Sequence, residues 1–219
     1  MQDLSAHAVS VFDRSARLYA DKYMDVTHYN QALEYFLQHC PLNAGLLELA
    51  CGPGNVTVYL KDRRPDISIF ATDLAPSMIA LARENVPGIR TGILDCRKIS
   101  TLSEKFDAVM ASFVLPYLLR NEARRLIEDA GQCLRDRGVL YLSTMEAGNE
   151  LSDWESSSRG DQVYINYYEC DFLCQLLNEQ GFEVLDKFRV PVEDHPKVKN
   201  DLILIARRQA TTELPKQYS

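Results

Sequence analysis

The amino-acid sequence lacks a long hydrophobic run and a leader-like start. No window of its 219 residues reaches the roughly 18 consecutive apolar residues of a membrane-spanning helix. The N-terminal stretch MQDLSAHAVSVFDRSARLYADKY carries charge at Asp3, Asp13 and Arg14, too early for a signal peptide. We therefore expect a cytoplasmic protein without a membrane partner.

Concentrated positive charge is also missing. The chain has 24 Lys and Arg against 31 Asp and Glu, a net charge of −7 with neutral histidines. Its basic clusters are short, because Asp62 interrupts Lys61–Arg64 and Arg207–Arg208 stands alone near the end. Since nucleic-acid phosphates are bound by concentrated basic faces, we expect no nucleic-acid partner.

The cysteines do not have the spacings of disulfide frameworks or metal-binding motifs. None of the six forms a CxxC pair, and no Cys/His pair has zinc-finger spacing. No clustered set of carboxylates marks a divalent-metal site either, so no metal is predicted. We expect most cysteines, Cys51 included, to pack as small buried hydrophobes.

What the sequence does contain is an alternation of strand-like and helix-like segments. Apolar, β-branched stretches predict strands at 45–50, 67–71, 92–94, 106–111 and 139–144. Helix-like segments lie between most of them, at 56–61, 77–85 and 121–134. This order predicts an α/β fold, with a mostly parallel sheet and right-handed crossover helices on both faces.

The two ends of the chain depart from this alternation. Residues 5–40 predict one or two amphipathic helices, whereas the polar, Ser- and Gly-rich segment 146–166 predicts a loop or small excursion. A helix at 169–179 is followed by two strands, at 182–190 and 201–206, whose short connection requires an antiparallel pair. We expect a single domain over 1–219, ending in a frayed tail at 209–219.

Polar and glycine residues follow the predicted parallel strands. In an open α/β sheet, ligands bind outside the carboxyl ends of the strands. Those ends carry, in chain order, Glu48, Cys51, Gly52 and Gly54, then Asp73, then Asp95, then Ser112 and Phe113. Three carboxylates therefore converge on one edge of the sheet by topology alone.

These residues suit a nucleoside that carries a charged amino-acid tail. A glycine pair lets backbone amides approach a ligand without a Cβ clash. Asp73 follows Gly54 by 19 residues, the distance at which a strand-end carboxylate meets two ribose hydroxyls. A dinucleotide site is the competing interpretation, but its G-x-G-x-x-G pattern, started at Gly52, has Thr57 in the third glycine place.

Four ordered segments, ELACGPGN, ATDLAPSMI, GILDCRKI and FDAVMASFVLPYL, resemble the motifs of class I S-adenosylmethionine-dependent methyltransferases. The likeness extends from Ser10 to Arg207, and the first glycine of the family's first motif is Ala50 here. The resemblance implies a Rossmann-like fold with a seven-stranded sheet. It also implies a helical cover over 1–42, a cofactor-binding half over 43–145 and a substrate-side half over 146–208.

The resemblance further implies a role for each matched position. The loop around the amino-acid portion of S-adenosyl-L-methionine would comprise Glu48 at its base, Ala50, Cys51, Gly52 and Gly54. Asp73 would hold the ribose hydroxyls, with Leu74 and Met78 against the adenine or ribose. Asp95 would bond the adenine amine, and Cys96 would offer its backbone N–H. The methyl-donor region would be lined by Ser112 and Phe113, and Tyr19 would bind the cofactor from the helical cover.

The sequence gives fewer signals for the site of the methyl acceptor. The segment Ala111–Tyr117 lacks the Asn/Asp-Pro-Pro-Tyr/Phe signature of enzymes that methylate base amino groups, which favours a small-molecule acceptor. Candidate substrate contacts are Tyr23, His28, Tyr117 and Tyr168, and candidate bases by location are His28 and Glu146. We expect a monomer or homodimer. Two other functions stay open: a module that binds S-adenosylmethionine without transfer, and a nicotinamide-dependent oxidoreductase.

Overall fold

The computed structural model describes residues 3–156, 160–193 and 195–210. Its α-helices are α1 Leu4–Tyr23, α2 Asn30–His39, α3 Asn55–Arg63, α4 Pro76–Asn85, α5 Arg120–Cys133 and α6 Cys170–Glu179. Short 3₁₀ helices are η1 Thr27–Tyr29, η2 Cys96–Thr101, η3 Leu115–Tyr117 and η4 Asn149–Leu151. The strands are β1 Gly45–Leu49, β2 Ser68–Asp73, β3 Arg90–Ile93, β4 Phe106–Ala111, β5 Leu134–Glu146, β6 Asp153–Ser156, β7 Gln162–Ile165, β8 Phe182–Pro191 and β9 Asn200–Arg208.

Seven of these strands form one sheet in the order β3-β2-β1-β4-β5-β9-β8. The first five pair in parallel, and β9 runs antiparallel to both β5 and β8. The mostly parallel seven-stranded sheet with an antiparallel C-terminal strand pair is thus confirmed. The strand order reverses at β1, and open sheets of this kind offer a ligand crevice at that switch point.

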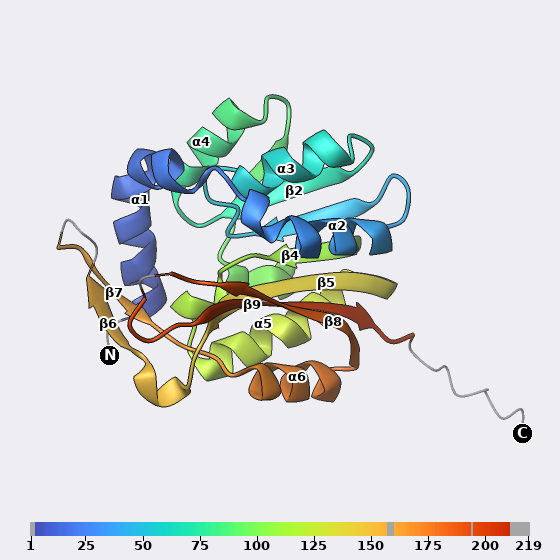
Figure 1. The fold of residues 1–219 in the computed structure, drawn as a ribbon. Helices are drawn as coiled ribbons and strands as arrows, with labels where there is room; N and C mark the ends of the chain where they lie inside the picture. The colour runs from blue at the N-terminus through green and yellow to red at the C-terminus, as the bar shows by residue number, and fades with distance from the viewer. Residues whose placement is uncertain (1–2, 157–159, 194, 211–219) are drawn as a thin grey trace, which may run out of the picture.

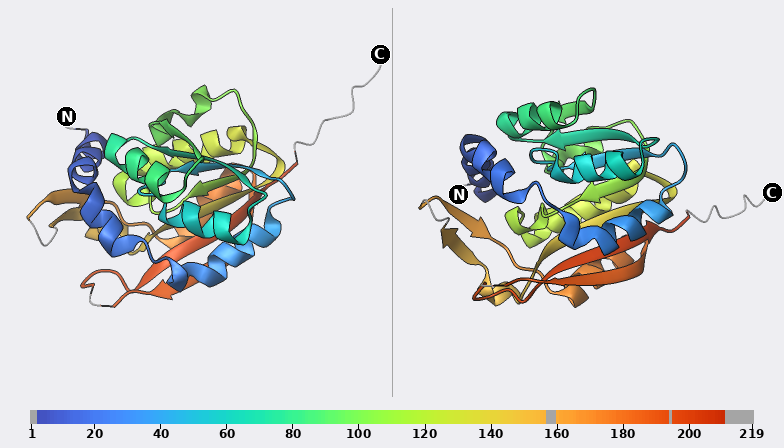
Figure 2. Two further views of the ribbon diagram at one scale, coloured as in Figure 1. Left: turned by 90° about the horizontal axis from the view of Figure 1, so that it is seen from above. Right: turned by 45° about the horizontal axis from the view of Figure 1, so that its top comes forward.

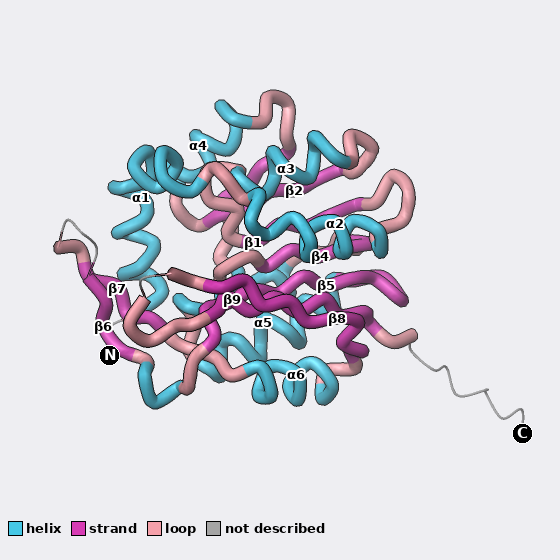
Figure 3. Tube along the Cα trace, viewed as in Figure 1, coloured by secondary structure: helices cyan, strands magenta, loops and turns pink. Residues whose placement is uncertain are grey.

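Helices cover both faces of the sheet, as Figures 1 and 3 show. Alternate residues of each strand point to opposite faces, so Leu46 packs on the side of α2 and α3 while Leu47 packs on the side of α5 and α6. All four of the central β1 residues Leu46–Leu49 are buried, as expected for a strand that is covered on both sides.

The predicted helical cover consists of two parts with different surroundings. Helix α2 belongs to a sheet layer, because Phe36 is fully buried and its ring meets Tyr141 of β5 at 5.7 Å. Helix α1 instead lies at the end of the sheet, between α4 and the β6–β7 hairpin (Figure 2). Only α1 is therefore placed to cover the carboxyl ends of the strands.

The segment 146–166, predicted as a loop or small excursion, contains the antiparallel β6–β7 hairpin. Its strands have four residues each and mix polar with aromatic side chains, which gives no clear alternation in the sequence. Trp154 pairs with Tyr164 across the hairpin and meets His7 of α1, so the hairpin is stabilised by aromatic contacts. Of the predicted tail, residues 211–219 lie outside the described residues.

None of the helices in the described ranges is long and apolar enough to cross a bilayer.

Candidate functional site

A cavity lies at the carboxyl ends of the parallel strands, under α1. Eleven of the residues singled out from the sequence line it: Tyr19, Ala50, Gly52, Asp73, Leu74, Met78, Asp95, Cys96, Ser112, Phe113 and Tyr117. These residues come from five separate segments of the chain, which the strand topology brings to one edge.

The turn after β1 is built from three residues with positive φ. Ala50 has φ 50°, Gly52 has φ 55° and Gly54 has φ 85°. A Cβ on Gly52 would lie 3.8 Å from a ring carbon of Tyr19, so glycine leaves open the space between the turn and the cover. Gly54 has another reason to be glycine, since a Cβ there would come within 3.3 Å of the Ala82 backbone of α4.

Asp73, the last residue of β2, holds this turn in place. Its Oδ2 accepts the Gly52 N–H at 2.9 Å, and its Oδ1 accepts the Ala75 N–H at 2.8 Å. Burial raises the pKa of Asp73, although these backbone N–H groups act in the opposite direction. A carboxylate has about four acceptor positions, so two remain beside the cavity.

Glu48 lies beneath the turn and is almost completely buried, with an exposed fraction of 1%. Thr57 of α3, which occupies the third glycine place of a dinucleotide motif, donates its hydroxyl to Glu48 Oε2 at 2.7 Å. Burial raises the pKa of Glu48 to about 7; the Thr57 hydrogen bond lowers it and the charge of Asp73 raises it further. Glu48 therefore supports the loop from below and does not line the cavity.

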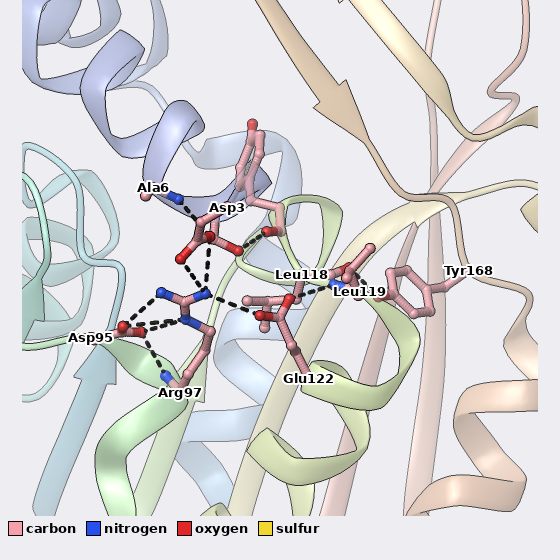
Figure 4. Close-up of polar contacts among 10 residues, drawn as sticks. Asp3, Ala6, Asp95, Arg97, Leu118, Leu119, Glu122 and Tyr168 are labelled. Atoms are coloured by element: carbon pink, nitrogen blue, oxygen red, sulfur yellow. Dashed lines mark hydrogen bonds and ion pairs between the residues drawn. The ribbon is translucent and has the colours of Figure 1, made fainter. Parts of the chain in front are cut away.

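Asp95 caps η2 and is bound by Arg97 (Figure 4). It accepts the Arg97 backbone N–H at 3.0 Å, and guanidinium N–H groups donate to its two oxygens at 2.8–3.2 Å. Burial would raise the pKa of Asp95, but the hydrogen bonds and charge of Arg97 outweigh it and the pKa lies below its usual value. Asp95 is therefore an ionised, fixed acceptor beside the cavity.

The backbone after β4 turns sharply at Phe113, which has φ 51°. This left-handed conformation is unusual for a bulky residue and often marks a functional site. Ser143 of β5 stabilises it, since its hydroxyl accepts the Phe113 N–H at 2.9 Å. Phe12 of α1, another lining residue, meets Tyr117 at 4.9 Å and Tyr19 at 5.7 Å. Aromatic rings therefore enclose this part of the cavity.

Several residues singled out from the sequence lie outside the cavity lining: Glu48, Cys51, Gly54, Tyr23, His28 and Tyr168. Tyr168 is fully buried and donates its hydroxyl to the Leu118 carbonyl at 2.6 Å. Tyr23 is 43% exposed and packs against Tyr19, while the His28 ring lies 3.9 Å from the Tyr29 ring in a tilted contact. Glu146 is bound at 2.7 Å through each oxygen by Arg189, which makes it a poor candidate base.

Other lining residues were not predicted as site residues: Ser5, Ala8, Val9, Phe12, Ala75, Leu94, Arg97, Val114 and Leu118. Val9 and Phe12 belong to the apolar stripe of α1, so the helical pattern already contained that signal. The sequence signal for Arg97 as a site residue was weaker: it lies two residues after Asp95.

The thiols at the site are protonated. Burial raises the pKa of Cys96 to about 12 and moves the pKa of Cys51 upward as well, with neighbouring carboxylates adding to both shifts. Burial also raises the pKa of Tyr19 to about 12. Within the described part of the chain, no three His, Cys, Asp or Glu side chains are grouped so as to hold a metal ion.

Comparison with known proteins finds similarity to methyltransferases. Residues 46–138 match the family model described as "Methyltransferase domain". The malonyl-[acyl-carrier protein] O-methyltransferase of Acetivibrio thermocellus is 34% identical over 101 residues, 45% of this chain and 35% of that protein. The carboxy-S-adenosyl-L-methionine synthase of Campylobacter lari is 22% identical over 202 residues, 90% of this chain and 82% of that protein.

Among solved structures, the 1,6-didemethyltoxoflavin-N1-methyltransferase of Burkholderia thailandensis has the same fold, with a TM-score of 0.70 at 21% identity. The match covers 93% of this chain and 88% of that chain. Residues 46–138 are thus similar to a methyltransferase domain, and the chain shares its fold with a solved methyltransferase. The match to the curated relative at 34% identity covers about a third of that protein's length.

Replacing Glu48 tests the role of its buried carboxyl. Folding raises the pKa of Glu48 from 4.5 to about 7, so the stability it contributes is present below pH 4.5 and is lost as the pH rises through 7. Glu48→Gln stays neutral. We therefore compare the free energy of unfolding of the variant with that of wild type by urea denaturation. The difference, variant minus wild type, should be about 2 kcal/mol larger at about pH 8.5 than at about pH 5.5. An equal difference at both pH values would contradict this assignment.

Proposed function

We propose that this chain binds S-adenosyl-L-methionine in the cavity at the carboxyl ends of the strands and transfers its methyl group to a small-molecule acceptor. The observation that carries the proposal is Asp73, which lines the cavity with two acceptor positions left after its bonds to Gly52 and Ala75. A ribose presents two neighbouring hydroxyls, which match those two positions.

The glycine turn supports the same ligand. Gly52 lines the cavity next to Tyr19 and has no Cβ, so a ligand can come close to its backbone. Asp95, held ionised by Arg97, suits the exocyclic amine of an adenine, and the Cys96 backbone lies next to it on the lining. The residues present therefore fit an adenosine with an amino-acid tail.

Electrostatics argue against a nicotinamide dinucleotide. Of the cavity-lining residues, Asp73 and Asp95 are acidic and Arg97 is the single Lys or Arg. Arg97 is already bound to Asp3, Asp95 and Glu122, so it is not free to pair with a pyrophosphate. The bonded Thr57 also replaces the third glycine that a dinucleotide motif uses for close packing of its helix.

Chemistry at this site depends mainly on positioning. When bound, S-adenosylmethionine supplies a methyl group that is already electrophilic because it is attached to a sulfonium. The chain's own contribution would be to hold the donor at Asp73 and Gly52 and to keep water away with α1. Phe12, Phe113 and Tyr117 would orient an acceptor in line, which can provide a large part of the rate enhancement.

The lining supports an acceptor of low molecular mass. Phe12, Phe113 and Tyr117 offer apolar and aromatic surface in a cavity that α1 covers, and a large acceptor would have to displace that helix. Relatives act on acceptors of this kind, as the name of the toxoflavin methyltransferase states for that enzyme.

Removing the charge of Asp73 tests the cofactor assignment. Asp73→Asn should weaken S-adenosylmethionine binding by about 10- to 100-fold in calorimetry, because a hydrogen bond to a charged group contributes about 1.5–3 kcal/mol. Asp62→Asn, an exposed acidic position on α3, is the matched control and should bind as wild type does. Melting curves of both variants exclude unfolding as the cause. Unchanged affinity in the Asp73 variant would refute the ribose assignment.

Turnover separates transfer from binding alone. Wild-type protein should release S-adenosylhomocysteine when S-adenosylmethionine is mixed with at least one class in a panel of small hydroxyl, amine, carboxylate and thiol compounds. Mass spectrometry should find the methylated product. A protein that binds S-adenosylmethionine tightly but releases no more S-adenosylhomocysteine than in acceptor-free samples would be a binding module instead.

A further inference from the structure

Three segments of the chain meet at one guanidinium group, that of the cavity-lining residue Arg97 (Figure 4). Its Nη1 donates to both oxygens of Asp3 at 3.1 Å and to Glu122 Oε1 at 3.0 Å. Its Nε and Nη2 bind Asp95, as described above. These carboxylates belong to α1, α5 and the turn before η2, so a single side chain joins segments that are far apart in the sequence.

Each of the three carboxylates also orders its own element. Asp3 is the N-cap of α1 and accepts the Ala6 N–H at 3.0 Å. Glu122 accepts the Leu119 N–H at 2.8 Å through its other oxygen, at the start of α5. Asp95 accepts the Arg97 N–H at the start of η2. Arg97 therefore fixes the starts of three helices relative to one another.

Two of these segments, and the 3₁₀ helix that precedes the third, supply walls of the cavity. Helix α1 contributes Ser5 and Phe12, the start of η2 contributes Asp95 and Arg97, and η3, just before α5, contributes Tyr117. A second bond joins two of these walls directly, since Ser5 donates its hydroxyl to the Tyr117 carbonyl at 2.7 Å. The bonds of Arg97 and Ser5 thus fix the position of α1 beside Asp95, in the part of the cavity that we assign to the adenosine.

The charges of the cluster make Arg97 necessary for this arrangement. Three carboxylates surround one cation, so its removal would leave three like charges facing one another. The side chain of Asp95 is 12% exposed and that of Asp3 is 48% exposed. Because exposed ion pairs are weak and screened by salt, the contact with Asp3 is the one that opens most easily.

We propose that Arg97 is a positioning residue that couples closure of α1 over the cavity to the placement of Asp95, with Arg97–Asp3 as the contact that opens when the ligand exchanges. This inference rests on the proposed function, in that the ligand is the adenosine of S-adenosylmethionine or S-adenosylhomocysteine. Arg97 acts here through Asp95 and α1 and takes no part in bond-making.

A second ion pair on α1 offers a matched control. Arg14 binds Asp161, next to the β6–β7 hairpin, at 2.6 Å, and neither residue lines the cavity. Asp3→Asn removes the negative charge that pairs with Arg97, but Asn caps helices as well as Asp does. Asp161→Asn removes a charge from another ion pair of the same helix, away from the cavity.

The experiment compares these two variants with wild type. S-adenosylhomocysteine dissociation is followed by stopped-flow displacement at about 0.05 M and about 0.5 M salt. Asp3→Asn should release the ligand about 2- to 5-fold faster at low salt and lose most of the salt dependence, whereas Asp161→Asn should behave as wild type does. Hydrogen exchange of ligand-free protein should be faster over residues 4–12 in the Asp3 variant only.

A double-mutant cycle with Arg97→Gln completes the test. The two substitutions Arg97→Gln and Asp3→Asn should be non-additive in the dissociation rate, since each removes the same contact. Equal behaviour of the Asp3 and Asp161 variants, or additivity in the cycle, would overturn the proposal. Failure of wild type to bind S-adenosylhomocysteine would refute the proposed function instead, and the exchange of the ligand-free proteins would still report on Arg97–Asp3.

Discussion

The hydrogen bond from the Gly52 N–H to the Asp73 carboxylate joins the turn after β1 to the end of β2, and the site depends on it. It holds a turn with three positive φ angles beside the strand that carries Asp73. Glu48 and Thr57 support that turn from below through a buried hydrogen bond. The parallel sheet brings the remaining walls to the same edge, so a short loop and one carboxylate define the cavity.

Much of this site could be predicted, because parallel topology fixes which residues share an edge. The residues after β1, β2, β3 and β4 were placed from strand positions and motifs, and most of them line the cavity. Tyr168 and Gly54 were placed less well. Tyr168 is buried in the core, and Gly54 is glycine because α4 approaches it closely. Both facts depend on residues far away in the sequence, so the local sequence does not reveal them.

The contacts that sequence patterns did not reveal are long-range and polar. Arg97 joins Asp3 and Glu122, which lie 94 and 25 residues away along the chain, and no periodicity relates those positions. The β6–β7 hairpin has four-residue strands whose pairing depends on aromatic neighbours such as Trp154. Helix α2 shared an amphipathic pattern with α1, yet it packs in a sheet layer while α1 covers the cavity.

The central claim is that the cavity is built for S-adenosylmethionine. Calorimetric titration of the wild-type protein with S-adenosylmethionine, S-adenosylhomocysteine and NAD tests it most directly. The arrangement of Asp73, Gly52 and Asp95 predicts that the first two ligands bind with a Kd of about 100 μM or tighter and that NAD gives no binding heat. Binding of NAD without binding of S-adenosylmethionine would contradict the account.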